Sequence, residues 1–146
     1  EDIVTKIREL DNKFSLEKFL KGAKNAFEMV LTAFAENDRQ TLESLLDKKT
    51  YNQFISEIDG RIKNGINLNL TLVALPIVEI KNIQLKDNKV FIDVFYQSQQ
   101  INILKNNQGE IIEGDVSQVD NIKDVWTFSK DLKLSDRWHL VQVNAS

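Results

Sequence analysis

The sequence predicts an α+β domain in which helices come first and a strongly curved antiparallel sheet follows. Ser15 to Asn37 has the pattern of one long amphipathic helix, because apolar residues recur at every third or fourth position over about six turns. From Gly65 onward apolar and polar residues alternate instead, as in half-buried strands joined by short polar turns. Helices followed by such a meander favour helices packed on one face of the sheet.

The helical half is predicted to contain four helices, over Asp2–Asp11, Ser15–Asn37, Arg39–Asp47 and Lys49–Asn64. Ser15 is the expected N-cap of the long helix, because its hydroxyl can accept from an otherwise unpaired backbone N–H. Asp38 is the expected cap of the third helix. Gly65 is the expected end of the fourth, since glycine readily adopts the left-handed conformation found there.

The sheet half is predicted to contain strands over Asn67–Leu72, Ile77–Leu85, Lys89–Leu104, Glu110–Val119, Lys123–Lys130 and Trp138–Val143. Pro76 lacks a backbone N–H and therefore indicates a sheet edge, a bulge or the end of a strand. Polar turns are expected at Lys86–Asn88 and Asn106–Gly109, with a bend or bulge at Asp120–Asn121. Strands this long must twist and bend. We therefore expect a cone that leaves a cavity between the long helix and the sheet.

We divide the chain into an N-terminal amphipathic helical segment, residues 1–13, and the cone domain, residues 14–146. No apolar run reaches the roughly 18 residues that a membrane-spanning helix needs. The chain starts at Glu1 without a methionine, so we expect it to be cut from a longer protein. A membrane anchor could then lie upstream.

The composition argues against several classes of function. The chain has no cysteine and one histidine, so neither a thiolate nor a histidine-based metal site is expected. The net charge is −3 and no basic stripe dominates, which argues against a nucleic-acid partner. Glycine-rich phosphate loops, nucleophile elbows and calcium loops are also missing. We expect no cofactor, no metal and no catalytic residues.

Three groups of residues are candidates for a site. Phe14, Lys18, Phe19, Lys21 and Lys24 could contact anionic lipid or a partner protein, or form a solvated helix face. Asp93 shares a strand face with Phe91 and Phe95, which could raise its pKa and make it a general base in the cavity. The alternative is a solvated or lysine-paired carboxylate. Trp126, Phe128 and Trp138 could line the cavity or belong to the core.

The C-terminal part resembles a known family. Val125–Leu132 (VWTFSKDL) followed by Asp136–Val141 (DRWHLV) is similar to the signature W-T-F-x-R/K-D…W-x-L-V. That signature belongs to the C-terminal domain of the mitochondrial import-motor subunit family Tim-forty-four and its bacterial relatives. The resemblance implies a fold similar to nuclear transport factor two, peripheral attachment to the inner membrane, and contact with cardiolipin-like lipids. It also implies chaperone and translocase partners, and it transfers no catalytic residue.

Our leading hypothesis is therefore a non-enzymatic, membrane-peripheral scaffold or adaptor domain. We expect it at a bacterial inner membrane, held peripherally or by a segment upstream of Glu1. The alternative is a small-molecule-binding or enzymatic cone-fold protein that uses the helix–sheet cavity with Asp93 as base. A third hypothesis is a peptide-binding or dimerising module that uses the outer face of the sheet. The sequence leaves all three open.

Overall fold

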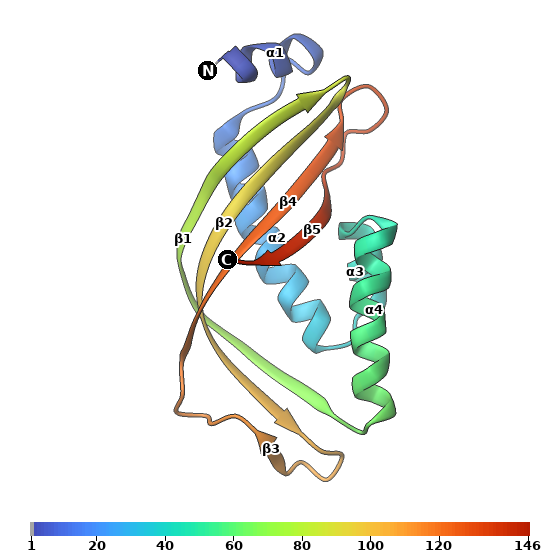
Figure 1. The fold of residues 1–146 in the computed structure, drawn as a ribbon, viewed down its shortest axis with the longest axis vertical. Coiled ribbons are helices and arrows are strands. Elements are labelled where there is room, and N and C mark those ends of the chain that lie inside the picture. The colour runs from blue at the N-terminus through green and yellow to red at the C-terminus, as the bar shows by residue number, and fades with distance from the viewer. Residues whose placement is uncertain (1) are drawn as a thin grey trace.

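A curled antiparallel sheet wraps around one long helix in the computed structural model, which describes residues 2–146 (Figure 1). The helices are α1 (Asp2–Leu10), α2 (Leu16–Ala35), α3 (Arg39–Leu45) and α4 (Lys48–Lys63). The strands are β1 (Asn67–Lys86), β2 (Lys89–Lys105), β3 (Ile111–Glu113), β4 (Asp120–Asp131) and β5 (His139–Ala145). The sheet order is β1-β2-β4-β5, and β3 pairs with β2. The predicted fold class is confirmed.

The helix ends follow local side-chain chemistry. The Ser15 hydroxyl accepts from the backbone N–H of Lys18 at 3.3 Å, which caps α2 as predicted. Asp38 caps α3 in the same way by accepting from the backbone N–H of Thr41 at 3.2 Å. Gly65 follows α4 with a φ of 66°, the left-handed conformation expected after a helix. The predicted helices are therefore all present, with ends that differ by one or two residues.

The strands depart from the prediction in three places. The segment predicted as a strand over Glu110–Val119 is paired only at β3, and the rest is loop. Pro76 does not divide two strands but lies inside β1, where the register shifts between Ala74 and Ile77. A proline is tolerated there because β1 is an edge strand, so its missing N–H breaks no ladder. Asp120 and Asn121 belong to β4 and form no separate bend.

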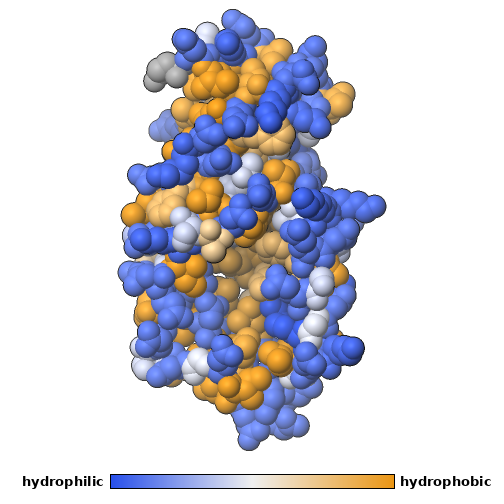
Figure 2. Space-filling view, in the orientation of Figure 1, coloured by the Kyte–Doolittle hydropathy of each residue, from blue (hydrophilic) through white to orange (hydrophobic). Residues whose placement is uncertain are grey.

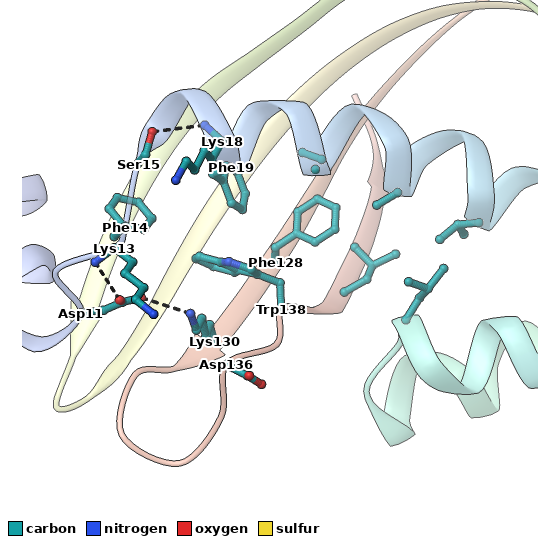
Figure 3. A pocket seen from close by; sticks show the side chains of 16 residues that line it. Asp11, Lys13, Phe14, Ser15, Lys18, Phe19, Phe128, Lys130, Asp136 and Trp138 are labelled. Atoms are coloured by element: carbon teal, nitrogen blue, oxygen red, sulfur yellow. Dashed lines mark hydrogen bonds and ion pairs between the residues drawn. The ribbon is translucent and has the colours of Figure 1, made fainter.

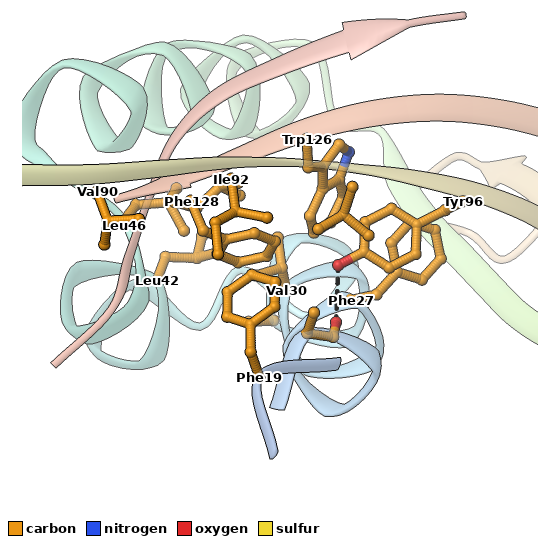
Figure 4. Packing of buried hydrophobic residues seen from close by; sticks show 14 of the residues in the cluster. Phe19, Phe27, Val30, Leu42, Leu46, Val90, Ile92, Tyr96, Trp126 and Phe128 are labelled. Carbon is orange, nitrogen blue, oxygen red and sulfur yellow. Dashed lines mark hydrogen bonds between the residues drawn. The ribbon is translucent and has the colours of Figure 1, made fainter. Parts of the chain in front are cut away.

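The core lies between α2 and the concave face of the sheet (Figure 4). Phe27 stacks on Tyr96 with a centroid distance of 4.3 Å and lies 4.7 Å from Trp126. The Tyr96 hydroxyl donates to the backbone carbonyl of Ala23 in α2 at 2.7 Å. Burial raises the pKa of Tyr96, so this hydroxyl stays protonated and remains a donor. Ile7 of α1 is also buried in the core, so α1 is packed against the domain.

Candidate functional site

A pocket of about 530 Å³ opens between the start of α2 and the strands β4 and β5 (Figure 3). Its apolar lining consists of Phe14, Phe19, Ala23, Ala26, Val30, Leu45, Phe128, Trp138 and Leu140. Polar side chains also border it, namely Asp11, Lys13, Ser15, Lys18, Lys130 and Asp136. This combination of an apolar interior with a few polar groups is typical of a ligand site.

Aromatic rings from two distant parts of the chain form one wall of the pocket. Phe19 of α2 lies 4.7 Å from Trp138, centroid to centroid, and 5.8 Å from Phe128 in an edge-to-face arrangement. Phe14, in the loop before α2, lies 6.3 Å from Trp138. Phe14 and Phe19 are buried, so they present their rings to the pocket rather than to the outer surface. The wall is therefore apolar and closely packed.

Small residues on α2 leave the volume of the pocket unfilled. Gly22, Ala23 and Ala26 line the side that faces the aromatic wall. A Cβ added at Gly22 would meet no atom within 4 Å. Larger apolar residues at these helix positions would reduce the cavity, because core side chains normally fill such space. Three small residues close together in the sequence, Gly22, Ala23 and Ala26, are the signal that could have indicated this pocket.

An ion pair joins the loop before α2 to β4 at the border of the pocket. Lys130 Nζ lies 3.1 Å from Asp11 Oδ2, and the two side chains are 13% and 19% exposed. Burial raises the pKa of the Asp11 carboxyl, but hydrogen bonds from Lys130 and from the backbone N–H of Lys13, with their positive charges, outweigh it. The net pKa of Asp11 is therefore lowered. Asp11 is thus a permanently ionised structural partner near neutral pH, unsuited to general-base work.

The structure brings together only some of the predicted site residues. Phe14, Lys18 and Phe19 line the pocket together with Phe128 and Trp138. Lys21 and Lys24 are exposed on α2, outside the pocket lining. Trp126 is buried in the core and is also absent from the lining.

The expectation that Phe91, Asp93 and Phe95 line the helix–sheet cavity is wrong. Their neighbours Ile92 and Val94 on β2 are buried in the core, and alternate residues of a strand point to opposite faces. These three residues therefore lie on the outer face. There the Thr127 hydroxyl donates to Asp93 Oδ1 at 2.7 Å. Asp93 is thus a cross-strand hydrogen-bond partner on the convex side, away from the pocket.

Among residues 2–146, no cluster of three or more histidine, cysteine, aspartate or glutamate side chains could hold a metal ion. No helix in that range is both long enough and apolar enough to cross a membrane.

Comparison with known proteins places the chain in a family. The family model described as "Tim44-like domain" matches residues 1–145. The chain belongs to the Tim44-like family. Human mitochondrial import inner membrane translocase subunit TIM44 is 24% identical over 149 residues, which cover 99% of this chain and 33% of that protein. The probable Caenorhabditis elegans subunit tin-44 is 21% identical, over 98% of this chain and 35% of its own length.

The Tim44-like chain spans about a third of the length of these curated relatives. Among solved structures, the intermembrane space region of the chloroplast protein ARC6 is similar with a TM-score of 0.59. The match has 13% sequence identity and covers 86% of this chain and 96% of that one. This likeness concerns the fold alone. The family assignment confirms the resemblance carried by the tail motif.

Proposed function

We propose that this Tim44-like domain is a non-enzymatic scaffold that lies at a membrane surface and holds an acyl chain of an anionic lipid in its pocket. One observation carries the proposal, namely the apolar cavity of about 530 Å³ with lysines at its border. Its aromatic and aliphatic walls suit hydrocarbon, and Lys13 and Lys18 suit a phosphate at the mouth. Lys21 and Lys24 extend the basic face along α2.

Vesicle flotation tests whether the domain binds an anionic membrane and whether the lysines of α2 are responsible. We expect the domain to float with vesicles that contain cardiolipin and not with neutral phosphatidylcholine vesicles. Reversing three charges, Lys18→Glu with Lys21→Glu and Lys24→Glu, is expected to weaken binding at least tenfold, since each basic residue near an anionic surface contributes about 1 kcal/mol. The matched control reverses exposed lysines of α4, Lys48→Glu with Lys49→Glu and Lys63→Glu. Absence of flotation, or equal loss in both variants, contradicts the lipid role.

A pocket-filling variant separates acyl binding from surface charge. Gly22→Leu is expected to narrow the cavity while the helix is kept, because a Cβ there meets nothing within 4 Å and leucine favours helix. Gly60→Leu makes the same change in α4, away from the pocket, where a Cβ also meets nothing within 4 Å. If the pocket binds an acyl chain, a fluorescent fatty acid should bind to the unsubstituted domain and to Gly60→Leu. Its binding should be lost in Gly22→Leu. Equal binding to both variants contradicts the acyl site.

Protein partners belong to the same proposal, because the curated relatives are named as subunits of an inner-membrane import translocase. We infer that this domain contributes to a membrane assembly that includes a translocase or a chaperone. Crosslinking and pull-down of the full protein from its native membrane test this inference. Recovery of such components supports it, and their absence from a crosslinked eluate opposes it. Sedimentation at several concentrations tests the separate hypothesis of a homodimer.

The enzymatic alternative loses its proposed base. Asp93 lies on the outer face, away from the pocket. Asp11, which does border the pocket, is held ionised by Lys130. What remains of that alternative is the binding of an apolar molecule, which the fatty-acid experiment also measures.

A further inference from the structure

Within residues 2–146 the sheet has three edge strands, and two of them carry features that oppose pairing with another chain. β1 contains Pro76, which cannot donate, and its register is irregular at three places. Part of the β5 edge is covered, since Leu46 bridges Leu140 and the N–H of Asp47 donates to the Leu140 carbonyl at 3.0 Å. Proteins commonly protect sheet edges in these ways. The third edge strand, β3, shares the irregular register, which shifts between Leu104 and Lys105 of β2, but it contains no proline and no other strand of residues 2–146 pairs with its outer edge.

β3 is an edge strand that presents apolar side chains. It pairs with β2 at Leu104–Glu113 and Lys105–Ile111, and its other edge pairs with no strand within residues 2–146. In β3 and in the loop that follows it, four large apolar residues are between 40% and 66% exposed, namely Ile111, Ile112, Val116 and Val119. Figure 1 places β3 at the opposite end of the molecule from α1. Figure 2 shows hydrophobic side chains gathered toward that end.

The segment around β3 is held in place, so its edge is available without reordering. Asn106 binds Glu110 in two ways, because its Oδ1 accepts from the Glu110 N–H at 3.0 Å and its Nδ2 donates to Glu110 Oε1 at 2.7 Å. Gly114 has a φ of 99° and sits directly on β2, where an added Cβ would lie 3.2 Å from Ile103 Cα. A pre-organised edge pays less ordering entropy when a partner binds.

The charge of this segment indicates its partner. Between Lys105 and Lys123 the chain has four acidic residues and no basic one. These are Glu110, Glu113, Asp115 and Asp120. An occupant of the β3 edge therefore meets exposed aliphatic side chains flanked by negative charge. A basic, apolar segment complements both properties, whereas an anionic membrane surface would be repelled.

We propose that the free edge of β3 binds an extended basic and apolar polypeptide segment by strand addition. Backbone hydrogen bonds to β3 supply the pairing, Ile111 and Ile112 supply apolar contact, and the acidic residues select lysine or arginine in the added strand. This site is separate from the pocket and does not depend on lipid binding. The domain would then contact lipid at one end and polypeptide at the other.

A peptide of about ten residues that alternates valine and lysine is the probe, with a valine–glutamate peptide as its counterpart. Fluorescence anisotropy with the 146-residue domain is expected to detect binding of the lysine peptide alone. Binding should weaken about fivefold in Glu110→Gln with Glu113→Gln, which removes two charges and keeps the acceptor that Asn106 uses. Ile112→Thr should weaken it by a similar factor.

Matched controls locate the site. Glu28→Gln with Glu43→Gln changes the net charge equally on exposed helix surfaces and is expected to leave the affinity unchanged. Val73→Thr replaces an exposed aliphatic side chain on the β1 edge, as Ile112→Thr does on β3, and is also expected to leave the affinity unchanged. A lysine peptide N-methylated at every residue should lose binding, because the methyl groups remove every backbone N–H and block both of its edges.

Three results would overturn the proposal. They are equal binding of the two peptides, unchanged affinity after neutralisation of Glu110 and Glu113, and indifference to N-methylation. Circular dichroism and thermal melting of each variant establish that it is folded. Vesicle flotation of the same variants reports on the pocket independently, so each of the two proposals can fail without the other.

Discussion

Large apolar residues are enclosed at one end of this domain and exposed at the other. At the α1 end, helix and sheet enclose the aromatic rings of Phe19, Phe128 and Trp138 around a cavity with lysines at its border. At the β3 end, Ile111 and Ile112 are about half exposed, and the charges nearby in the sequence are negative. Enclosed apolar surface suits a hydrocarbon that leaves water completely. Exposed apolar surface on a strand edge suits a partner that adds its own backbone.

The contrast shows that one sheet can carry two kinds of binding surface. β2 contributes to both ends, since its first half packs against α2 and its last residues pair with β3. Along β2, the packing against α2 ends and the neighbouring charges change from positive to negative. Substitutions at the two ends should therefore differ in their effect on stability.

The largest expected effect is at the pocket wall. Phe19→Ala should lower the free energy of unfolding by about 3 kcal/mol, because it removes a buried ring that contacts two other aromatic rings. Ile112→Ala should change it by about 0.5 kcal/mol, because that side chain is half exposed. Urea denaturation of both variants measures the difference. Equal destabilisation would mean that the β3 end is as tightly packed as the pocket.

Gly114→Ala should loosen the β3 end alone. The substitution strains a backbone with a φ of 99° and forces the new methyl against the Asn102 carbonyl, at a local cost of about 2 kcal/mol. Hydrogen exchange of the amides in β3 should become about thirtyfold faster, while amides at the start of α2 keep their rates. Gly109→Ala is the control, because its φ of 84° is strained as well but its Cβ meets no neighbour.

Breaking the Lys130–Asp11 pair should have a smaller, pH-dependent effect. Lys130→Met should cost about 1 kcal/mol near neutral pH, because it leaves a mostly buried carboxylate without its cation. The folded pKa of Asp11 is lowered from its ordinary 3.8. Asp11 therefore adds stability above that ordinary value, and this stability is lost as the pH falls through the lower folded value.

In Lys130→Met the lowering of the Asp11 pKa should largely disappear. The variant should therefore lose less stability than the unsubstituted protein on acidification. Urea unfolding at neutral pH and at about pH 3 tests this difference. Lys123→Met, in the same strand, is the control for loss of a lysine. An unchanged acid dependence in Lys130→Met would show that other carboxylates dominate it.

The smallest expected effects stabilise the protein. Gly22→Ala and Gly60→Ala should each raise the free energy of unfolding by about 0.5 to 1 kcal/mol, because both lie inside helices with open space at Cβ. Thermal melting compares them. A gain at Gly60 alone would indicate that Gly22 is needed for the local conformation at the pocket.

The sequence predicted the pocket end better than the β3 end. The apolar repeat of α2 and the caps Ser15 and Asp38 are local signals, and the structure bears them out. The strand predicted over Glu110–Val119 failed because its alternating residues have no partner beyond Glu113. Pairing of that segment depends on where β4 begins, which alternation cannot reveal.

The candidate site was predicted only in part. Phe14, Lys18 and Phe19 were linked by proximity in the sequence, and the structure adds Phe128 and Trp138 to them. Asp93 was assigned to the wrong face. Alternation alone gives two sets of residues on β2, and only the packing of Ile92 and Val94 against α2 decides which set is inside. Gly22 and Ala26 share one face of α2, but only the packing of the strands against that face shows that their small side chains leave a cavity.

The hydrogen bond from Tyr96 to the Ala23 carbonyl has a consequence for the geometry of the whole domain. It ties the helix backbone to the sheet at one point, close to the middle of α2, and so fixes the rotation of the helix about its own axis. A rotation of α2 by one residue would carry Gly22 and Ala26 away from Trp138 and replace them with longer side chains. The Tyr96 hydroxyl thus helps to set which face of α2 lines the pocket, although Tyr96 itself is not part of the lining.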